Sequence, residues 1–169
     1  MAANKYLKNN AGTITEQEAS QSSAGVTDAG KIIALDATGK LDTTMMPTGI
    51  AADTALIATS EALAAGDFIN IYNSSGAKCR KADASTAGKE AHGFVLAAVD
   101  SGNNATVYFE GSNTQVTGQT PGVVFLSATS PGLATPTAPS STGNVVQRIG
   151  FAIGTTSINF QSQVPIVLV

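Results

Sequence analysis

The sequence has little charge and few aromatic residues. Of its 169 residues, 12% are charged, 5% are aromatic and none is tryptophan, whereas an average soluble domain has about 25% charged residues. The net charge is −3 and the nine basic residues form no dense patch that could hold a phosphate backbone, which argues against nucleic acid as a partner. The small, polar composition is typical of β-proteins that gain stability by assembling.

Cysteine and long apolar runs are also scarce. Cys79 is the only cysteine, so the fold cannot depend on an intrachain disulfide. The first ten residues, MAANKYLKNN, lack the apolar stretch of a secretory signal. The longest strongly apolar run, residues 164–169, is far too short to span a membrane. We therefore expect a protein that is made in a cytoplasm and has no membrane partner.

The charged residues are distributed unevenly. All twelve acidic residues lie between Glu16 and Glu110, and from residue 111 to the last residue the only charge is Arg148. Such a surface is either a neutral one of Ser, Thr and Asn, or one that other copies or a partner cover. We favour a covered surface, because a surface this poor in charge is hard to keep monodisperse.

The search for catalytic motifs gives no enzyme site. The segment from Gly25 to Lys31 has the spacing of a phosphate-binding loop, but Ile32 follows the lysine where a magnesium-binding Ser or Thr is needed. His92 is the only histidine and no Gly-x-Ser-x-Gly motif accompanies it. Three copies of His92 on a trimer axis could hold a metal ion, but an ordinary histidine at a strand edge is the favoured interpretation.

The remaining reactive side chain is Cys79. It lies between Lys78 and Arg80, which could lower its pKa, but the alternating pattern favours an inward-pointing strand residue. The twelve carboxylates include no pair that the sequence singles out for glycoside cleavage. We therefore predict no enzyme activity, no catalytic or metal-binding residues, no cofactor and no small-molecule substrate.

Three segments follow one another along the chain. Residues 1–29 are almost all small or polar and are predicted to be a flexible arm, with a short helix possible at 13–20. Residues 30–50 have the apolar–turn–apolar pattern of a hairpin, which ends at Pro47. Residues 51–169 are predicted to form an all-β domain, a compact antiparallel β-barrel or sandwich, with one helical turn possible at 61–65. The expected strands are 54–59, 67–72, 77–82, 93–99, 105–109, 123–126, 145–153, 157–160 and 165–169.

The all-β segment contains a probable internal repeat, with half-repeats at 62–110 and 118–160. The pair Gly93-Phe94 recurs 57 residues later as Gly150-Phe151, and Gly66 recurs 56 residues later as a glycine that opens another Val/Phe-rich strand. Two similar four-stranded units that close into one barrel would explain these offsets. The alternative is coincidence among residues that are common in β-strands.

The following stretches carry a resemblance to a known group of proteins: AGVTDAGKI (24–32), LDATGKLD (35–42), MMP (45–47), KADAS (81–85), EAHGFV (90–95), ATVYFEG (105–111), GVVFLSATSPG (122–132) and TAPSSTGNVVQ (137–147). They resemble structural proteins of tailed bacteriophages, among them head-fibre, tail-fibre and decoration proteins. The resemblance implies a virion structural protein, commonly a homotrimer, and it brings no catalytic residues. We expect a trimeric capsid decoration protein that binds the major capsid protein at the outer capsid surface; the alternative is a tail-fibre or baseplate component involved in host attachment.

The hairpin-like segment is the predicted element of docking and oligomerisation. An isolated two-stranded hairpin is marginally stable in water, whereas three around an axis could bury their apolar residues together. The alternative is that the segment packs on the barrel of its own chain. The predicted interface residues are Tyr6, Leu7, Ile32, Ile33, Leu35, Leu41, Met45 and Met46.

Overall fold

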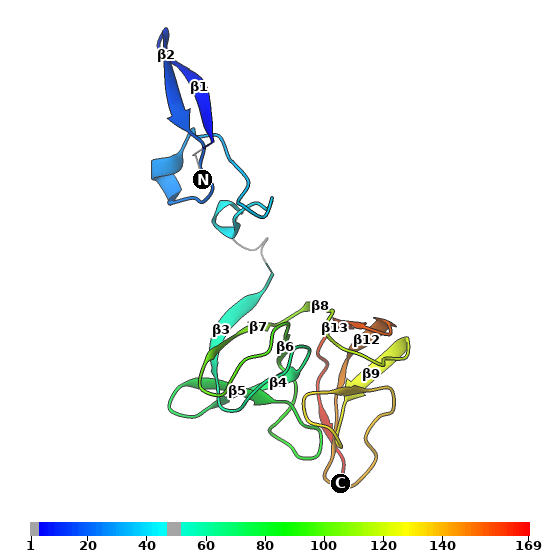
Figure 1. Cartoon of the computed structure of the whole chain (residues 1–169). Coiled ribbons are helices and arrows are strands. Elements are labelled where there is room, and N and C mark those ends of the chain that lie inside the picture. The colour runs from blue at the N-terminus through cyan, green and yellow to red at the C-terminus, as the bar shows by residue number, and fades with distance from the viewer. Residues whose placement is uncertain (1–3, 47–51) are drawn as a thin grey trace. The chain divides into compact units, whose positions relative to one another are not determined.

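A computed structural model describes residues 4–46 and 52–169 of the chain, which divides into two compact units at residues 1–51 and 52–169 (Figure 1). The described residues form fourteen strands and two short 3₁₀ helices, η1 (Gly25–Asp28) and η2 (Thr43–Met45). The all-β prediction is therefore confirmed. The helical turn expected at 61–65 is wrong, because Leu63 instead exchanges two backbone hydrogen bonds with Val99.

The N-terminal unit begins with a regular hairpin. β1 (Lys5–Asn10) and β2 (Thr13–Glu18) pair over six residues. They are joined by Ala11 and Gly12, which both have positive φ, as a two-residue hairpin turn of the favoured handedness requires. The prediction of a possible helix at 13–20 is wrong, because residues 13–18 form β2 and the turn allows two polar strands to satisfy each other's backbone groups.

The expected hairpin at 30–50 does not form as such. The turn at Asp36 is present, with the Asp36 amide donating to the Lys40 carbonyl at 2.8 Å. The residues before the turn, however, pair with Ser20: the Ser20 amide donates to Ile32 and the Ala34 amide donates to Ser20. Residues 32–34 therefore pair with Ser20 of the N-terminal arm and do not form a hairpin of their own. Residues 47–50 of the predicted segment lie outside the described residues.

The first half of the C-terminal unit is a closed five-stranded barrel in the order β3-β5-β4-β6-β7. β3 pairs antiparallel with β7 and parallel with β5, so the expected antiparallel barrel contains one parallel pair. The parallel pair arises because β3 closes the barrel by bridging its two outer strands. The strands are β3 (Thr54–Thr59), β4 (Phe68–Asn73), β5 (Ala77–Lys81), β6 (Gly93–Val95) and β7 (Asn104–Tyr108).

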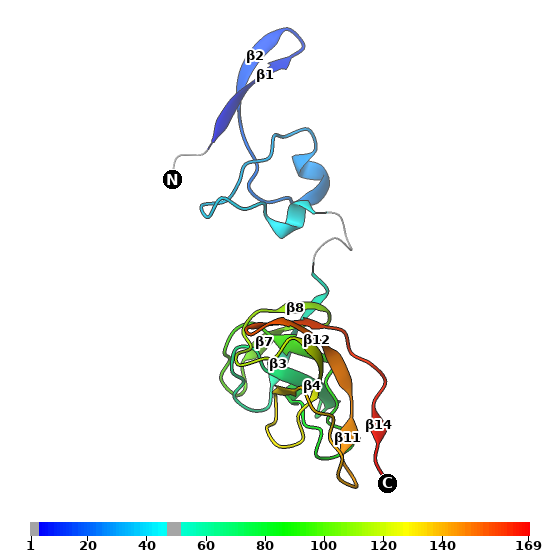
Figure 2. The same ribbon diagram turned by 90° about the vertical axis from the view of Figure 1, so that its right-hand side faces the viewer.

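The second half is an open sheet in the order β10-β9-β12-β13-β8. It does not join the first half in one barrel, as the repeat predicted. β8 pairs with β13 as β3 pairs with β7, but among the described residues β8 forms no pairing with β10 that would close this sheet. A separate ribbon pairs β11 with β14 near the C-terminus (Figure 2). The strands are β8 (Gly111–Asn113), β9 (Gly122–Leu126), β10 (Ala134–Thr135), β11 (Val145–Val146), β12 (Arg148–Gly154), β13 (Ser157–Phe160) and β14 (Ile166–Val167).

Two cores hold the C-terminal unit together. One fills the barrel and includes Ile69, Cys79 and Val107. The other lies between the barrel and the open sheet, where the ring of Phe160 is 5.7 Å from the rings of both Phe68 and Phe94, measured between centroids. The second core joins the two halves into one body.

The two halves share a strand order, because β5-β4-β6-β7 matches β10-β9-β12-β13. The glycines of the repeated Gly-Phe pair also have equivalent surroundings. A Cβ atom on Gly93 would lie 2.5 Å from the Tyr108 carbonyl oxygen, and one on Gly150 would lie 2.0 Å from that of Asn159. The same close approach of two strands at both places supports an internal repeat.

Candidate functional site

The N-terminal unit exposes apolar side chains and has almost no core of its own. Among its described residues, Ala34 is the only buried hydrophobic residue. Six of the eight predicted interface residues are exposed, and the other two, Tyr6 and Met45, are partly buried. The exposed six are Leu7, Ile32, Ile33, Leu35, Leu41 and Met46. Two further hydrophobic residues of the same unit, Ile14 and Val26, are also exposed.

The hairpin register separates two faces. Leu7 pairs with Glu16 and Ile14 pairs with Asn9, so Leu7 and Ile14 lie on the same face as diagonal neighbours. Tyr6 lies on the opposite face, where its hydroxyl accepts a hydrogen bond from the Ile32 amide at 3.4 Å. One face therefore contacts the rest of the N-terminal unit. The other presents two aliphatic side chains that sequence reasoning covered only in part, because Ile14 was not among the predicted interface residues.

Aspartate side chains hold the turns of this unit. Asp28 bonds to the Lys31 ammonium at 2.7 Å and accepts from the Ala24 amide, and the Lys31 contact is the main reason why its pKa is lowered. Asp36 accepts from the backbone of Lys40, which lowers the pKa of Asp36 in the same way. These bonds are solvent-exposed, so they fix local shape and add little net stability. They also occupy Lys31, the lysine of the phosphate-loop-like spacing.

His92 and Cys79 occupy different environments. His92 is exposed and its Nδ1 accepts a hydrogen bond from the Ile71 amide at 2.9 Å, which leaves Nε2 toward solvent. Cys79 is fully buried inside the barrel between half-buried Lys78 and Arg80, as the inward-pointing interpretation predicted. Burial raises the pKa of the Cys79 thiol. Within residues 4–46 and 52–169, no three His, Cys, Asp or Glu side chains gather as a metal site would need.

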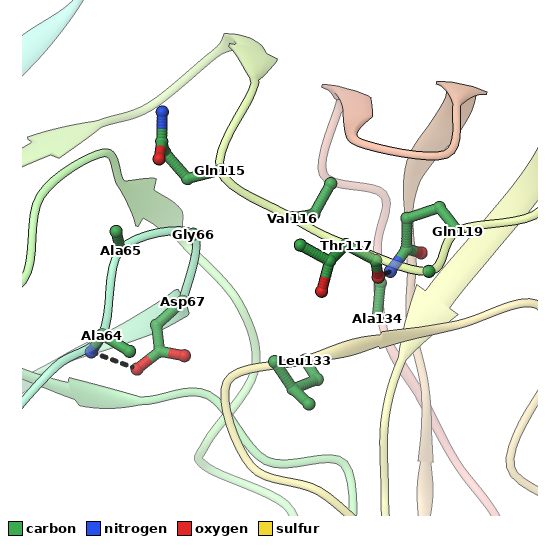
Figure 3. Close-up of a pocket in the computed structure, with 11 residues that line it drawn as sticks. Ala64, Ala65, Gly66, Asp67, Gln115, Val116, Thr117, Gln119, Leu133 and Ala134 are labelled. Atoms are coloured by element: carbon green, nitrogen blue, oxygen red, sulfur yellow. Dashed lines mark hydrogen bonds between the residues drawn. The ribbon is translucent and has the colours of Figure 1, made fainter.

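A cavity of about 330 Å³ lies between the turn at residues 64–67 and the loop at residues 115–119 (Figure 3). The Asp67 side chain at its edge is only 4% exposed, accepts from the Ala64 amide at 2.8 Å and lies 3.4 Å from the Lys81 ammonium. Burial raises the pKa of Asp67 despite these contacts.

The polar groups around this cavity serve the fold. The Asp67 carboxylate closes its own turn, and the Gln119 amide donates to the Thr117 carbonyl within its own loop. In Figure 3 the Gln115 side chain points away from Leu133. The cavity therefore presents no converging set of free polar groups for a ligand, and no sequence signal pointed to it.

No protein-family model, curated protein or solved structure matches this chain. The resemblance to phage structural proteins therefore rests on the sequence stretches quoted above. Over the part of the chain that the structure describes, we find no helix with the length and apolar character needed to cross a bilayer. The exposed apolar side chains of the N-terminal unit are the feature most suggestive of function.

Proposed function

We propose that this chain is a non-enzymatic structural protein of a tailed-phage virion, a homotrimer that decorates the outer capsid surface and binds the major capsid protein. The observation that supports an assembling protein most directly is the N-terminal unit, in which Ala34 is the only buried hydrophobic among the described residues. Folded segments of about 40 residues usually need oligomerisation, a metal or disulfides to be stable. The chain has a single cysteine, which excludes an intrachain disulfide, and oligomerisation is the stabilising device that we propose for the N-terminal unit.

The exposed side chains supply the driving force for assembly. Full burial of one Leu, Ile or Met side chain stabilises by roughly 1.5–3 kcal/mol. The six exposed interface residues are already about half covered, so their burial contributes on the order of 5–10 kcal/mol per copy before ordering costs are subtracted. That contribution is large enough for the N-terminal unit to become ordered when it contacts neighbouring subunits.

A trimer multiplies a weak attachment. Each trimer carries three N-terminal units, and once one unit binds the shell the other two bind intramolecularly, which raises the overall affinity by orders of magnitude. Surface buried across neighbouring coat subunits then opposes their separation under internal pressure. Copies distributed over the shell reinforce it without catalysis.

The copy number in purified virions tests the location. It is measured by quantitative mass spectrometry against the major capsid protein. A number comparable to that of the coat protein supports decoration of the shell. A handful of copies per particle contradicts it and places the protein at a vertex or on the tail, as a fibre or baseplate component.

The oligomeric interface is tested separately by Ile33→Asp in the full chain. A charge at this exposed position should dissociate the trimer in sedimentation velocity experiments. Val26→Asp is the matched control, because Val26 is an exposed aliphatic residue of the same unit outside the predicted interface. A trimer that survives Ile33→Asp contradicts the proposed interface. A monomeric wild type that Ile33→Asp merely destabilises supports packing of the segment within its own chain.

A further inference from the structure

The outer face of β9 and β12 carries exposed apolar side chains. The inner face of β9 and β12 packs in the core through Val124, Leu126 and Ile149. On the outer face, Val123 pairs with Phe151, and these residues are 38% and 37% exposed, with Ile153 64% exposed on the same strand as Phe151. This patch of Val123, Phe151 and Ile153 is named the sheet patch here.

One charged side chain, that of Arg148, lies against the sheet patch. The Arg148 guanidinium lies 4.1 Å from the centre of the Phe151 ring, and Arg148 is the only charged residue after Glu110. Its Nε is buried and has no hydrogen-bond partner among the residues that the structure describes. Arginine and aromatic side chains are the residues most enriched at energetically dominant interface positions. A carboxylate on a partner is the group that pairs most strongly with a guanidinium, through its terminal nitrogens.

A complementary surface lies on the outside of the barrel. Leu56 of β3 is 72% exposed and pairs with Thr106 of β7, which lines a hollow of about 240 Å³. Asp100 follows Val99, which also lines the hollow, and its carboxylate forms no ion pair or hydrogen bond within residues 4–46 and 52–169. This barrel hollow is lined by Leu96, Ala97, Val99, Asn104, Thr106 and Tyr108.

We propose that the sheet patch of one copy docks in the barrel hollow of a second copy. Phe151 and Ile153 fill the hollow, and Arg148 meets Asp100. The charge distribution favours a second copy as the occupant, because every acidic residue lies before Gly111 and the cation of the sheet patch lies after it. Each copy therefore carries both halves of one apolar contact with one charge pair.

This contact is heterologous, because it joins two different surfaces of the same chain. Repetition of such a contact closes a ring when the rotation between copies allows it, and otherwise builds a filament. The proposal deepens the homotrimer proposed above and rests on self-assembly, but it uses none of the N-terminal surface. Variants can therefore separate the two interfaces.

Cysteine cross-linking tests the contact in the full chain. The double variant Ile153→Cys/Thr106→Cys, treated with a short bismaleimide, should give a ladder that ends at the trimer. Each single variant should stay monomeric on a denaturing gel, and Cys79 is buried and should not react. Ile153→Cys/Ser75→Cys is the control, with Ser75 in an exposed turn away from the barrel hollow.

The possible outcomes are distinct. A ladder from the double variant alone supports the proposal. Dimers from Ile153→Cys alone would show a symmetric sheet-to-sheet contact and overturn it, as would the absence of any ladder. The same double variant carrying Ile33→Asp separates the two proposals, because a ladder that persists there shows the sheet contact to stand even if the N-terminal interface fails.

A charge exchange tests the ion pair. Arg148→Asp and Asp100→Arg should each raise the dissociation constant for self-association at least tenfold, and the combined exchange should restore most of the affinity. Lys78→Asp is the control for the same change of charge elsewhere on the barrel. Thermal unfolding shows whether each variant is folded. Failure of the combined exchange to recover affinity in a folded protein would overturn the pairing of Arg148 with Asp100.

Discussion

Gly150 should be among the residues of the C-terminal unit that tolerate alanine least. Its φ is +143°, a region that side chains with a Cβ rarely adopt, and an added Cβ would lie 2.0 Å from the Asn159 carbonyl oxygen. The oxygen belongs to the paired backbone of β13, so it cannot move away as a flexible side chain would. Gly150→Ala must therefore strain the backbone and separate β12 from β13.

The magnitude follows from two contributions. A residue held in a sparsely populated φ/ψ region costs about 1–3 kcal/mol. Relief of the close contact by a backbone shift costs about 1–3 kcal/mol more, by analogy with overpacked cores. The sum, roughly 2–6 kcal/mol, is a large fraction of the 5–15 kcal/mol that stabilises a typical protein. The melting temperature should fall by on the order of 10–20 °C.

Urea denaturation followed by circular dichroism measures the effect, and two other glycines serve as controls. Gly154 is on the same strand with ordinary φ and open space around its Cβ direction, so Gly154→Ala should change stability by less than about 1 kcal/mol. Gly143 has φ +83° and open space, so Gly143→Ala isolates the backbone contribution. The reasoning is refuted if Gly150→Ala costs no more than Gly154→Ala. A cost equal to that of Gly143→Ala would show that the contact with Asn159 is irrelevant.

Three further predictions concern buried polar groups. Burial raises the folded-state pKa of Asp67, so the folded state binds the Asp67 proton more tightly than the unfolded state does. The folded protein therefore loses stability as the pH rises above about 4. Urea titrations from pH 3 to 7 should show Asp67→Asn gaining stability relative to wild type as the pH rises. Cys79 should react with a thiol reagent at pH 8 only at the rate of unfolding, because it is buried and its pKa is raised; immediate labelling of native protein would contradict this. Gln147 is bonded to both backbone groups of Ala91 at 2.7 and 2.9 Å, so Gln147→Met should cost about 1–3 kcal/mol in the same urea assay, and an unchanged midpoint would show that these bonds contribute nothing.

Local sequence pattern predicted much of the C-terminal unit. The strands at 54–59 and 157–160 were predicted with the boundaries that β3 and β13 have. β8 and β10 escaped notice because they have three and two residues, too few to show alternation. The parallel pairing of β3 with β5 joins strands that are distant in the chain, so no local pattern encodes it. Closure of only one half of the repeat follows from that pairing.

The N-terminal unit was harder to predict because its strands are polar. KYLKNN and TITEQE lack the apolar alternation that usually marks a strand. The available signal was the turn: Ala11-Gly12 joins them, and Gly12 adopts positive φ readily. The apolar residues around Ile33, which the sequence predicts as interface residues, are exposed in the structure. The sheet patch was not predicted, since Phe151 and Ile153 look like ordinary core residues until the inner face of β12 is known.

Under the proposed function, the small core of the N-terminal unit also determines what happens to copies that do not assemble. A segment whose order depends on contact with neighbours opens often when those neighbours are missing, and proteolysis follows the population of the open form. Free copies should therefore be cut within residues 4–46, while the C-terminal unit, with its two cores, resists. A copy trimmed in this way lacks Ile33 and its neighbours and no longer competes for binding positions. The same lack of a core thus limits the lifetime of copies that fail to assemble.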